Sequence, residues 1–176
     1  MAVPTEIDVW QGDVSELEVD AIIVPANESL FMTTPVARAV KRRAGQVVEV
    51  EAVGQAPAQA GSAVVTGGGL LATPYIIHAV AVGHDLRPDR ERLARALDAA
   101  LEIAGRLGLG RLAMAPVGLE HGVFTPDDAA GVLMAVLAER VTRGATLPAQ
   151  LVVAVTGRGE AAAFRVAAES PGAPSR

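Results

Sequence analysis

The sequence predicts an α/β protein in which a sheet lies between two layers of helices. Segments typical of strands alternate with segments that have the periodicity of helices. Several strand segments, such as 21–24 and 151–155, are continuous apolar runs, which indicates strands buried on both faces. These observations predict a three-layer α/β/α fold. We expect a single domain over residues 1–169, followed by a disordered tail at 170–176 that is rich in Pro, Gly and Ser.

The first half of the chain is organised around the stretch 20–30, whose apolar run resembles a central strand. Pro25 is predicted to stop this strand because proline has no backbone N–H, which places Asn27 just beyond its carboxyl end. Thr34 is suited to cap a helix whose first residue is Pro35. In this half, strands are predicted at 6–10, 19–24, 61–66 and 75–80, and helices at 35–43 and 46–55.

The second half contains the clearest helix, at 89–107, where apolar residues recur every three or four positions until Gly108. The segment 125–128 has the pattern of a capping box that opens another helix. Further strands are predicted at 112–115 and 151–155, and a last helix carries Phe164.

Composition excludes several classes of function. The chain has 51% hydrophobic residues, 3% aromatic residues and no cysteine, so disulfides, thiol nucleophiles and thiolate metal sites are excluded. No apolar run approaches the length of about 20 residues that spans a bilayer, and no signal peptide is visible, so we expect a cytoplasmic protein without a membrane partner. A net charge of −5 argues against nucleic acid as the primary partner. Three scattered histidines give no ligand spacing, so we expect no metal and no cofactor.

Six segments in one order resemble the macro domain family, and together they cover about residues 6 to 166. They are 12–14, 19–27, 36–45, 61–67, 76–80 and 116–130. The resemblance implies a mixed, mostly parallel six-stranded sheet between helices. It also implies a cleft for ADP-ribose or a related small phosphorylated ligand, in proteins that bind it and in hydrolases that act on ADP-ribosyl groups.

Individual positions match the family's ligand contacts. Asp13 matches the carboxylate that accepts from the adenine amino group, with the backbone amide of Val14 beside it, and Asn27 matches the asparagine at the distal ribose. Val36 would pack beneath the diphosphate. The second phosphate loop corresponds to 118–125, with Gly118, Gly122, Val123 and Phe124 as ligand-binding candidates, and Phe164 is placed near the adenine.

Three departures from the family pattern concern the phosphates. The first phosphate loop, usually glycine-rich, is here the segment 32–35, in which Pro35 also removes an amide. Glu120 in the second loop would repel a diphosphate unless it turns to solvent. Ala37 stands where one hydrolytic branch of the family has a catalytic Asp. We therefore expect weakened or altered affinity.

The candidate residues also have simpler interpretations. Asn27 and Asp13 could be turn residues that satisfy neighbouring backbone groups. His78 lies in an apolar strand and is interpreted as a core histidine with a satisfied ring. His121 is either a solvated loop histidine or a group that donates to phosphate or transfers a proton.

Three hypotheses for function follow. The first is a macro-domain-like binder of ADP-ribose or a related nucleotide. The second is a hydrolase of ADP-ribosyl or phospho-ester substrates, in which the catalytic candidates are Asn27, to orient a water, and His121 or Glu120, to transfer a proton. The third is a degenerate fold that serves as a protein-interaction module. The sequence does not predict the oligomeric state.

Overall fold

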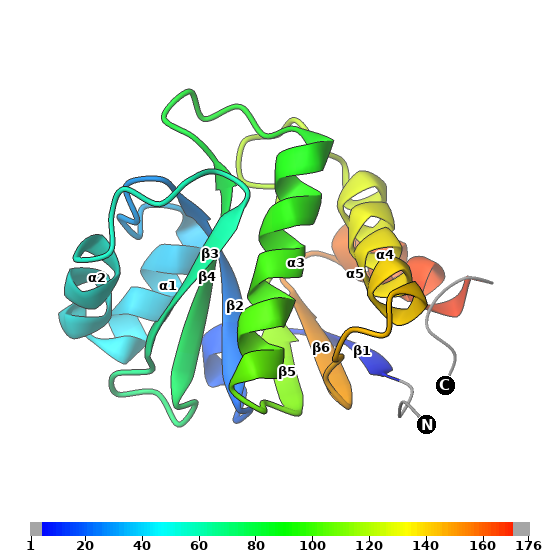
Figure 1. Cartoon of the computed structure of the whole chain (residues 1–176), viewed down its shortest axis with the longest axis horizontal. Coiled ribbons are helices and arrows are strands. Elements are labelled where there is room, and N and C mark those ends of the chain that lie inside the picture. The colour runs from blue at the N-terminus through cyan, green and yellow to red at the C-terminus, as the bar shows by residue number, and fades with distance from the viewer. Residues whose placement is uncertain (1–4, 171–176) are drawn as a thin grey trace.

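The computed structural model describes residues 5–170, which form one mixed sheet flanked by helices (Figure 1). The predicted tail, apart from Ser170, lies outside the described residues. The elements are β1 (Glu6–Gln11), the 3₁₀ helix η1 (Val14–Glu16), β2 (Ala21–Asn27), α1 (Pro35–Ala44), α2 (Gln46–Val53), β3 (Ser62–Gly67), β4 (Tyr75–Val82), α3 (Arg90–Arg106), β5 (Arg111–Met114), α4 (Pro126–Thr142), β6 (Gln150–Val155) and α5 (Arg158–Glu169).

The six strands lie in the order β1-β6-β5-β2-β4-β3. All neighbouring pairs are parallel except β3 and β4, which are antiparallel. The predicted mixed, mostly parallel sheet is confirmed. Because five strands run in the same direction, their carboxyl ends meet at one edge of the sheet, where ligands bind in open α/β folds.

Two layers of helices cover the sheet, and β2 shows why its residues are apolar without a break. Ile23 packs in the larger core cluster with residues of α3, α4 and α5. Ile22 and Val24 point to the opposite face and pack with Val40 of α1. The three β2 side chains are fully buried, as predicted for a strand covered on both faces. None of the helices within residues 5–170 is both long enough and apolar enough to cross a bilayer.

The prediction that Pro25 stops the central strand is wrong. β2 continues to Asn27 and pairs with β4 over its whole length, with a register shift after Ala26. Pairing with β5 does stop early, at Ile23, whose carbonyl accepts from the amide of Ala115. The backbone N–H and C=O groups of residues two apart in a strand point toward the same neighbouring strand. The backbone of Pro25 therefore points toward β5, as that of Ile23 does, at a place where β5 no longer pairs and no N–H is needed. Asn27 is therefore the last residue of the strand rather than a residue beyond it.

The interpretation of His78 as a core histidine is confirmed. Its ring is buried in β4, and Nε2 lies 3.0 Å from Oγ1 of Thr66 on the antiparallel neighbour β3. Burial lowers the pKa of His78 to about 4, because the charged ring would lose its hydration there. The ring is thus neutral at physiological pH and stabilises the β3–β4 pair through one hydrogen bond.

Candidate functional site

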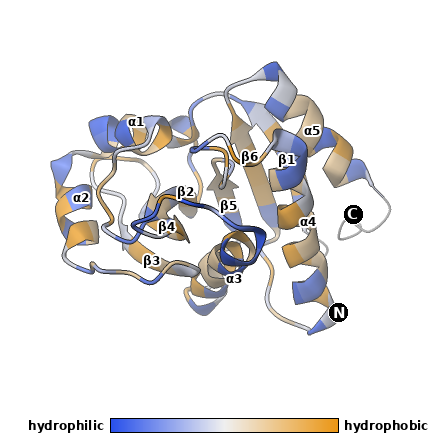
Figure 2. Ribbon diagram, turned by 90° about the horizontal axis from the view of Figure 1, so that it is seen from above, coloured by the Kyte–Doolittle hydropathy of each residue, from blue (hydrophilic) through white to orange (hydrophobic). Residues whose placement is uncertain are grey.

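The candidate residues are distributed along the carboxyl edge of the sheet, which Figure 2 shows from above. Asp13 follows β1, the loop at 115–125 follows β5, and Asn27 ends β2. In the order β1-β6-β5-β2, Asp13 and Asn27 are three strand positions apart, and the loop after β5 lies between them. Neighbouring strands are about 4.8 Å apart, so the site extends over roughly 14 Å. Such a site suits an elongated ligand.

Asp13 caps the short helix η1 at one end of the site. Its Oδ1 accepts from the backbone amide of Ser15 at 2.9 Å and from the Ser15 hydroxyl at 2.7 Å. Its Oδ2 accepts no hydrogen bond from another residue of the range 5–170. The predicted turn role is present, and one carboxylate oxygen is left to accept from a ligand. Val14, the next residue, is buried in the core beneath it.

Asn27 has the same arrangement at the other end. Its Oδ1 accepts from the backbone amide of Ser29 at 3.0 Å and from the Ser29 hydroxyl at 2.6 Å. The backbone then turns sharply, with Leu30 at a φ of 58°, a conformation that is uncommon outside glycine. The side-chain Nδ2 donates to no other described residue. The turn orients the amide and leaves its donor for a ligand.

Glu49 holds the first loop, which leads from Asn27 to α1. Its Oε2 accepts from the backbone amide of Met32 at 2.8 Å and from Nζ of Lys41 at 2.9 Å, while Oε1 accepts from Gln46. Burial raises the pKa of this carboxyl, but the hydrogen bonds from Lys41, Met32 and Gln46 outweigh it, so the pKa is lowered. The Met32 amide is therefore occupied by a carboxylate of the protein itself.

We expect Glu49→Gln to lower the free energy of unfolding by about 1–2 kcal/mol. Glutamine keeps one acceptor oxygen but loses the charge that binds Lys41, so one of the three contacts is weakened and another lost. Urea unfolding at pH 7 measures the change. Glu51→Gln is the control in the same helix, because Glu51 is exposed and, among the residues that the structure describes, accepts only from the amide of Gly67. Equal losses in the two variants would contradict this role of Glu49.

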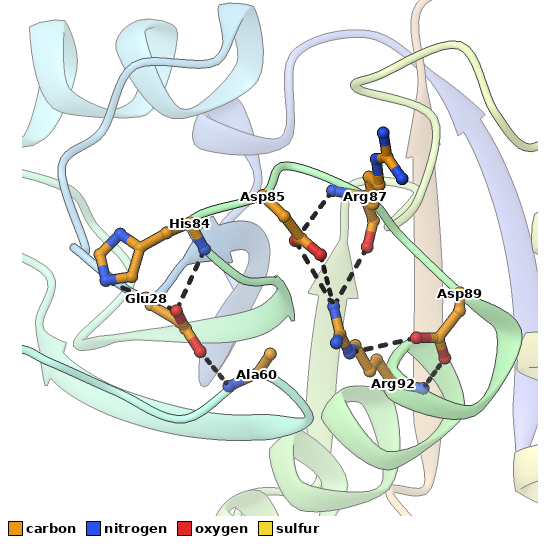
Figure 3. Close-up of polar contacts among 7 residues, drawn as sticks. All are labelled: Glu28, Ala60, His84, Asp85, Arg87, Asp89 and Arg92. Atoms are coloured by element: carbon orange, nitrogen blue, oxygen red, sulfur yellow. Dashed lines mark hydrogen bonds and ion pairs between the residues drawn. The ribbon is translucent and has the colours of Figure 1, made fainter.

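Glu28 connects three segments beside Asn27, as Figure 3 shows. Its Oε1 accepts from the amide of Ala60 at 3.3 Å, ahead of β3, and its Oε2 accepts from the amide of His84 at 3.1 Å, beyond the end of β4. The ring of His84 lies 3.5 Å from the same oxygen. Glu28 thus fixes the end of β2 against its neighbours.

The rest of the loop after β4 is held to the first turn of α3. Asp85 accepts from the amide of Arg87 at 3.1 Å, and this bond, with Arg92 nearby, lowers the pKa of Asp85. Arg92 lies between Asp85, at 3.5 Å, and Asp89, at 3.1 Å (Figure 3). These exposed pairs orient the loop, whereas the guanidinium of Arg87 forms no ion pair with the residues drawn in Figure 3.

The second loop folds back on itself through Glu120. The Glu120 Oε2 accepts from the backbone amide of Gly118 at 3.0 Å, so the carboxylate does not turn to solvent. Burial raises the pKa of Glu120 to about 7, although its own amide and that of Gly118 act in the opposite direction.

His121 is half-buried, and its side chain forms no hydrogen bond with another described residue. Gly122 and Val123 are exposed, and Phe124 packs against the larger core.

Two other predicted contacts have different outcomes. Val36 is half-buried at the start of α1 and packs against the core below the first loop, where it remains a candidate. Phe164 is only 1% exposed and lies within the larger core cluster, so it offers no face to an adenine and this prediction is wrong.

Within residues 5–170, no three His, Asp or Glu side chains are grouped as a metal site would require.

A family model, the Macro domain, matches residues 23–133 of the sequence. The chain belongs to the macro domain family. Among relatives of this macro domain, an uncharacterized protein from Aeropyrum pernix is 33% identical over 137 residues, covering 77% of this chain and 71% of that protein. An uncharacterized protein from Mycobacterium tuberculosis is 34% identical over 165 residues. That match covers 94% of this chain, which spans only 45% of the longer mycobacterial protein.

Solved structures show the same fold for this macro domain. The crystal structure of the Trypanosoma brucei macrodomain in complex with ADP-ribose is similar with a TM-score of 0.82 and 20% identity. The match covers 92% of this chain and 68% of that one.

Glu28 and Glu49 are site-supporting residues that the sequence analysis did not identify. Glu28 binds an amide 56 residues away, and Glu49 binds one 17 residues away. No spacing of residues in the sequence indicates hydrogen bonds between positions this far apart. The one available signal for Glu49 was a carboxylate inside a helix of mostly apolar residues, which requires a partner when it is buried.

Proposed function

We propose that this macro domain binds ADP-ribose, or a closely related adenosine diphosphate ligand, along the carboxyl edge of its sheet. Asp13 and Val14 would contact the adenine, the loop 118–125 the diphosphate, and Asn27 the distal ribose. Val36, Gly118, Gly122, Val123 and Phe124 complete the proposed contacts. The composition of the chain is the basis for proposing that it acts in the cytoplasm.

The observation that carries this proposal is the order of the candidate residues across the sheet. Asp13 follows β1, the loop follows β5 and Asn27 ends β2, and these three strands lie in this order along one edge, with β6 between β1 and β5. The adenine, the diphosphate and the distal ribose would occupy the same sequence of positions. The complex of the Trypanosoma brucei macrodomain with ADP-ribose supports a ligand of this kind for the fold.

The unpaired atoms at the two ends support the same orientation. Oδ2 of Asp13 is an acceptor and matches the exocyclic amino group of adenine, which is a donor. Nδ2 of Asn27 is a donor and matches a ribose hydroxyl oxygen. In each residue the second polar atom is fixed by a serine two positions later, so both side chains are held in place before a ligand arrives.

Two isosteric variants test this proposal by isothermal titration with ADP-ribose. Asp13→Asn keeps an oxygen for Ser15 but replaces the free acceptor by a donor, and Asn27→Asp keeps the bond to Ser29 but removes the donor. We expect each to weaken binding about tenfold to a hundredfold, the loss of 1.5 to 3 kcal/mol typical of a polar contact with a mismatched partner. The unmutated protein should bind ADP-ribose more tightly than AMP or inorganic phosphate.

The matched control is Glu139→Gln in the last turn of α4, where the exposed carboxylate forms no hydrogen bond or ion pair with a described residue. Its affinity for ADP-ribose should equal that of the unmutated protein. Affinity that survives both site variants, alone and combined, would refute the assignment of the site. If isothermal titration up to millimolar ADP-ribose produces no heat, the proposal that ADP-ribose is the ligand is refuted.

A hydrolase is the second candidate function, and Glu120 is the observation that favours it. A carboxyl group with a pKa near 7 is suited to transfer a proton at physiological pH. Ala37, where one hydrolytic branch has an Asp, is buried at 3% exposure and offers no such group. Release of ADP-ribose from an ADP-ribosylated peptide would distinguish turnover from binding.

A further inference from the structure

The contact between Glu120 and Gly118 is the feature of the second loop that the proposed function does not explain. Glu120 is half-buried, and its Oε2 receives the Gly118 amide at 3.0 Å. Gly118 has a φ of 103°, and a Cβ at this position would lie 2.9 Å from Leu93 and 3.3 Å from Phe124. The backbone is thus confined between α3 and the end of the loop. The amide therefore has a fixed direction, and Glu120 has turned to meet it.

This amide is able to bind an anion, because a carboxylate of the protein already occupies it. Charge-assisted bonds from backbone amides to oxyanions are among the stronger hydrogen bonds in proteins. Gly118 follows β5, the direct neighbour of β2, so its amide lies on the same edge as Asn27, one strand position away. A ligand that binds across this edge meets an amide that already donates its hydrogen bond to a negatively charged carboxylate.

Glu120 forms no ion pair with another residue of the range 5–170, and the arginines of the first turn of α3 have other partners. Arg90 in the first turn of α3 pairs with Asp128 of α4 at 3.2 Å. Arg92, in the same turn, pairs with Asp85 and Asp89. The neighbouring His121 forms no ion pair within residues 5–170, and Asp127 at the start of α4 adds a further negative charge. The carboxylate of Glu120 therefore has no ion-pair partner among the described residues where it accepts from the Gly118 amide.

We propose that Glu120 is a specificity-determining residue, whose carboxylate occupies the Gly118 amide and must be displaced by any ligand that presents a phosphate there. The inference rests on the proposed function. The site would consequently distinguish ligands by their charge. The nucleoside part of a ligand binds without hindrance, whereas each negative charge near Gly118 competes with the Glu120 carboxylate for the amide. Among adenosine diphosphate ligands, the site therefore favours those that place the least negative charge near Gly118.

Isothermal titration at pH 8 with two ligands tests this inference. ADP-ribose carries the diphosphate, and adenosine carries none. Glu120→Ala frees the Gly118 amide and should bind ADP-ribose about tenfold or more tightly than the unmutated protein, with adenosine affinity unchanged. Glu120→Gln removes the charge but keeps an oxygen that can accept from Gly118, so its gain for ADP-ribose should be smaller. This isosteric variant also preserves the loop contact.

Glu91→Ala is the matched control, because it removes one negative charge from an exposed position of the adjacent α3 turn without loss of a described contact. It should leave both affinities unchanged. If the unmutated protein binds ADP-ribose and neither Glu120 variant binds it more tightly, the inference is overturned and the proposed function stands. An equal gain for adenosine would also overturn it, since the discrimination would then not depend on charge. If neither the unmutated protein nor Glu120→Ala binds ADP-ribose, the proposed function and the inference both fall.

Discussion

Arg140→Met is expected to lower the free energy of unfolding by about 3 kcal/mol, at the lower end of the range for breaking a buried ion pair. Arg140 is 1% exposed in α4. Its guanidinium donates to the Asp98 carboxylate at 2.6 Å, to Glu102 at 3.0 Å and to the backbone carbonyl of Thr146 at 3.1 Å. Methionine fills the space of the stem but donates nothing, so α3, α4 and the segment before β6 lose their common link.

The two carboxylates can regain hydration, because the side chains of Asp98 and Glu102 are 35% and 55% exposed. Arg140 also donates to two backbone carbonyls, those of Asp98 and Thr146, and the loss of these bonds is why most of the effect should persist. Urea unfolding at pH 7.5 measures it. Arg143→Met is the matched control: Arg143 binds the same Asp98 but is 43% exposed, and exposed pairs contribute about 0–1 kcal/mol. Similar losses in both variants would refute the distinction.

The fold could be predicted because its signals are local. The apolar run of β2, the spacing of α3 and the capping box at Thr125 each depend on residues close together in the sequence. The error at Pro25 has a non-local cause. Whether a missing amide ends a strand depends on which neighbour it would have faced, and that is decided by β5, almost ninety residues later in the chain.

The candidate site was predictable only in part, for the same reason. Asp13 and Asn27 have local partners in Ser15 and Ser29, and the sequence pointed to both their turn roles and their ligand roles. The direction of Glu120 could not be predicted. The sequence placed a charge in the loop, but whether it turned to solvent depended on the fold of the loop around Gly118, and the resulting burial raises the pKa of Glu120.

Between pH 8 and pH 5, the free energy of unfolding is expected to stay nearly constant because the buried His78 and the half-buried Glu120 titrate with opposite effects. Burial lowers the pKa of His78 from 6.5 to about 4, so its contribution is complete above pH 6.5 and is lost as the pH falls through 4. Burial raises the pKa of Glu120 from 4.5 to about 7, so its contribution is complete below pH 4.5 and is lost as the pH rises through 7. Over this interval each group changes the stability by about 2 kcal/mol, in opposite directions.

Single variants should separate the two contributions in urea unfolding at pH 8, 6.5 and 5. Glu120→Gln keeps only the titration of His78, so its free energy of unfolding should fall by about 2 kcal/mol from pH 8 to pH 5. His78→Gln, which can still bond to Thr66, should instead gain about 2 kcal/mol over the same interval. Carboxylates with lowered pKa values, such as Glu49 and Asp128, destabilise the fold only at lower pH, so they do not obscure the result. A profile for Glu120→Gln that is parallel to that of the unmutated protein would show that the loop does not bury its carboxylate in solution.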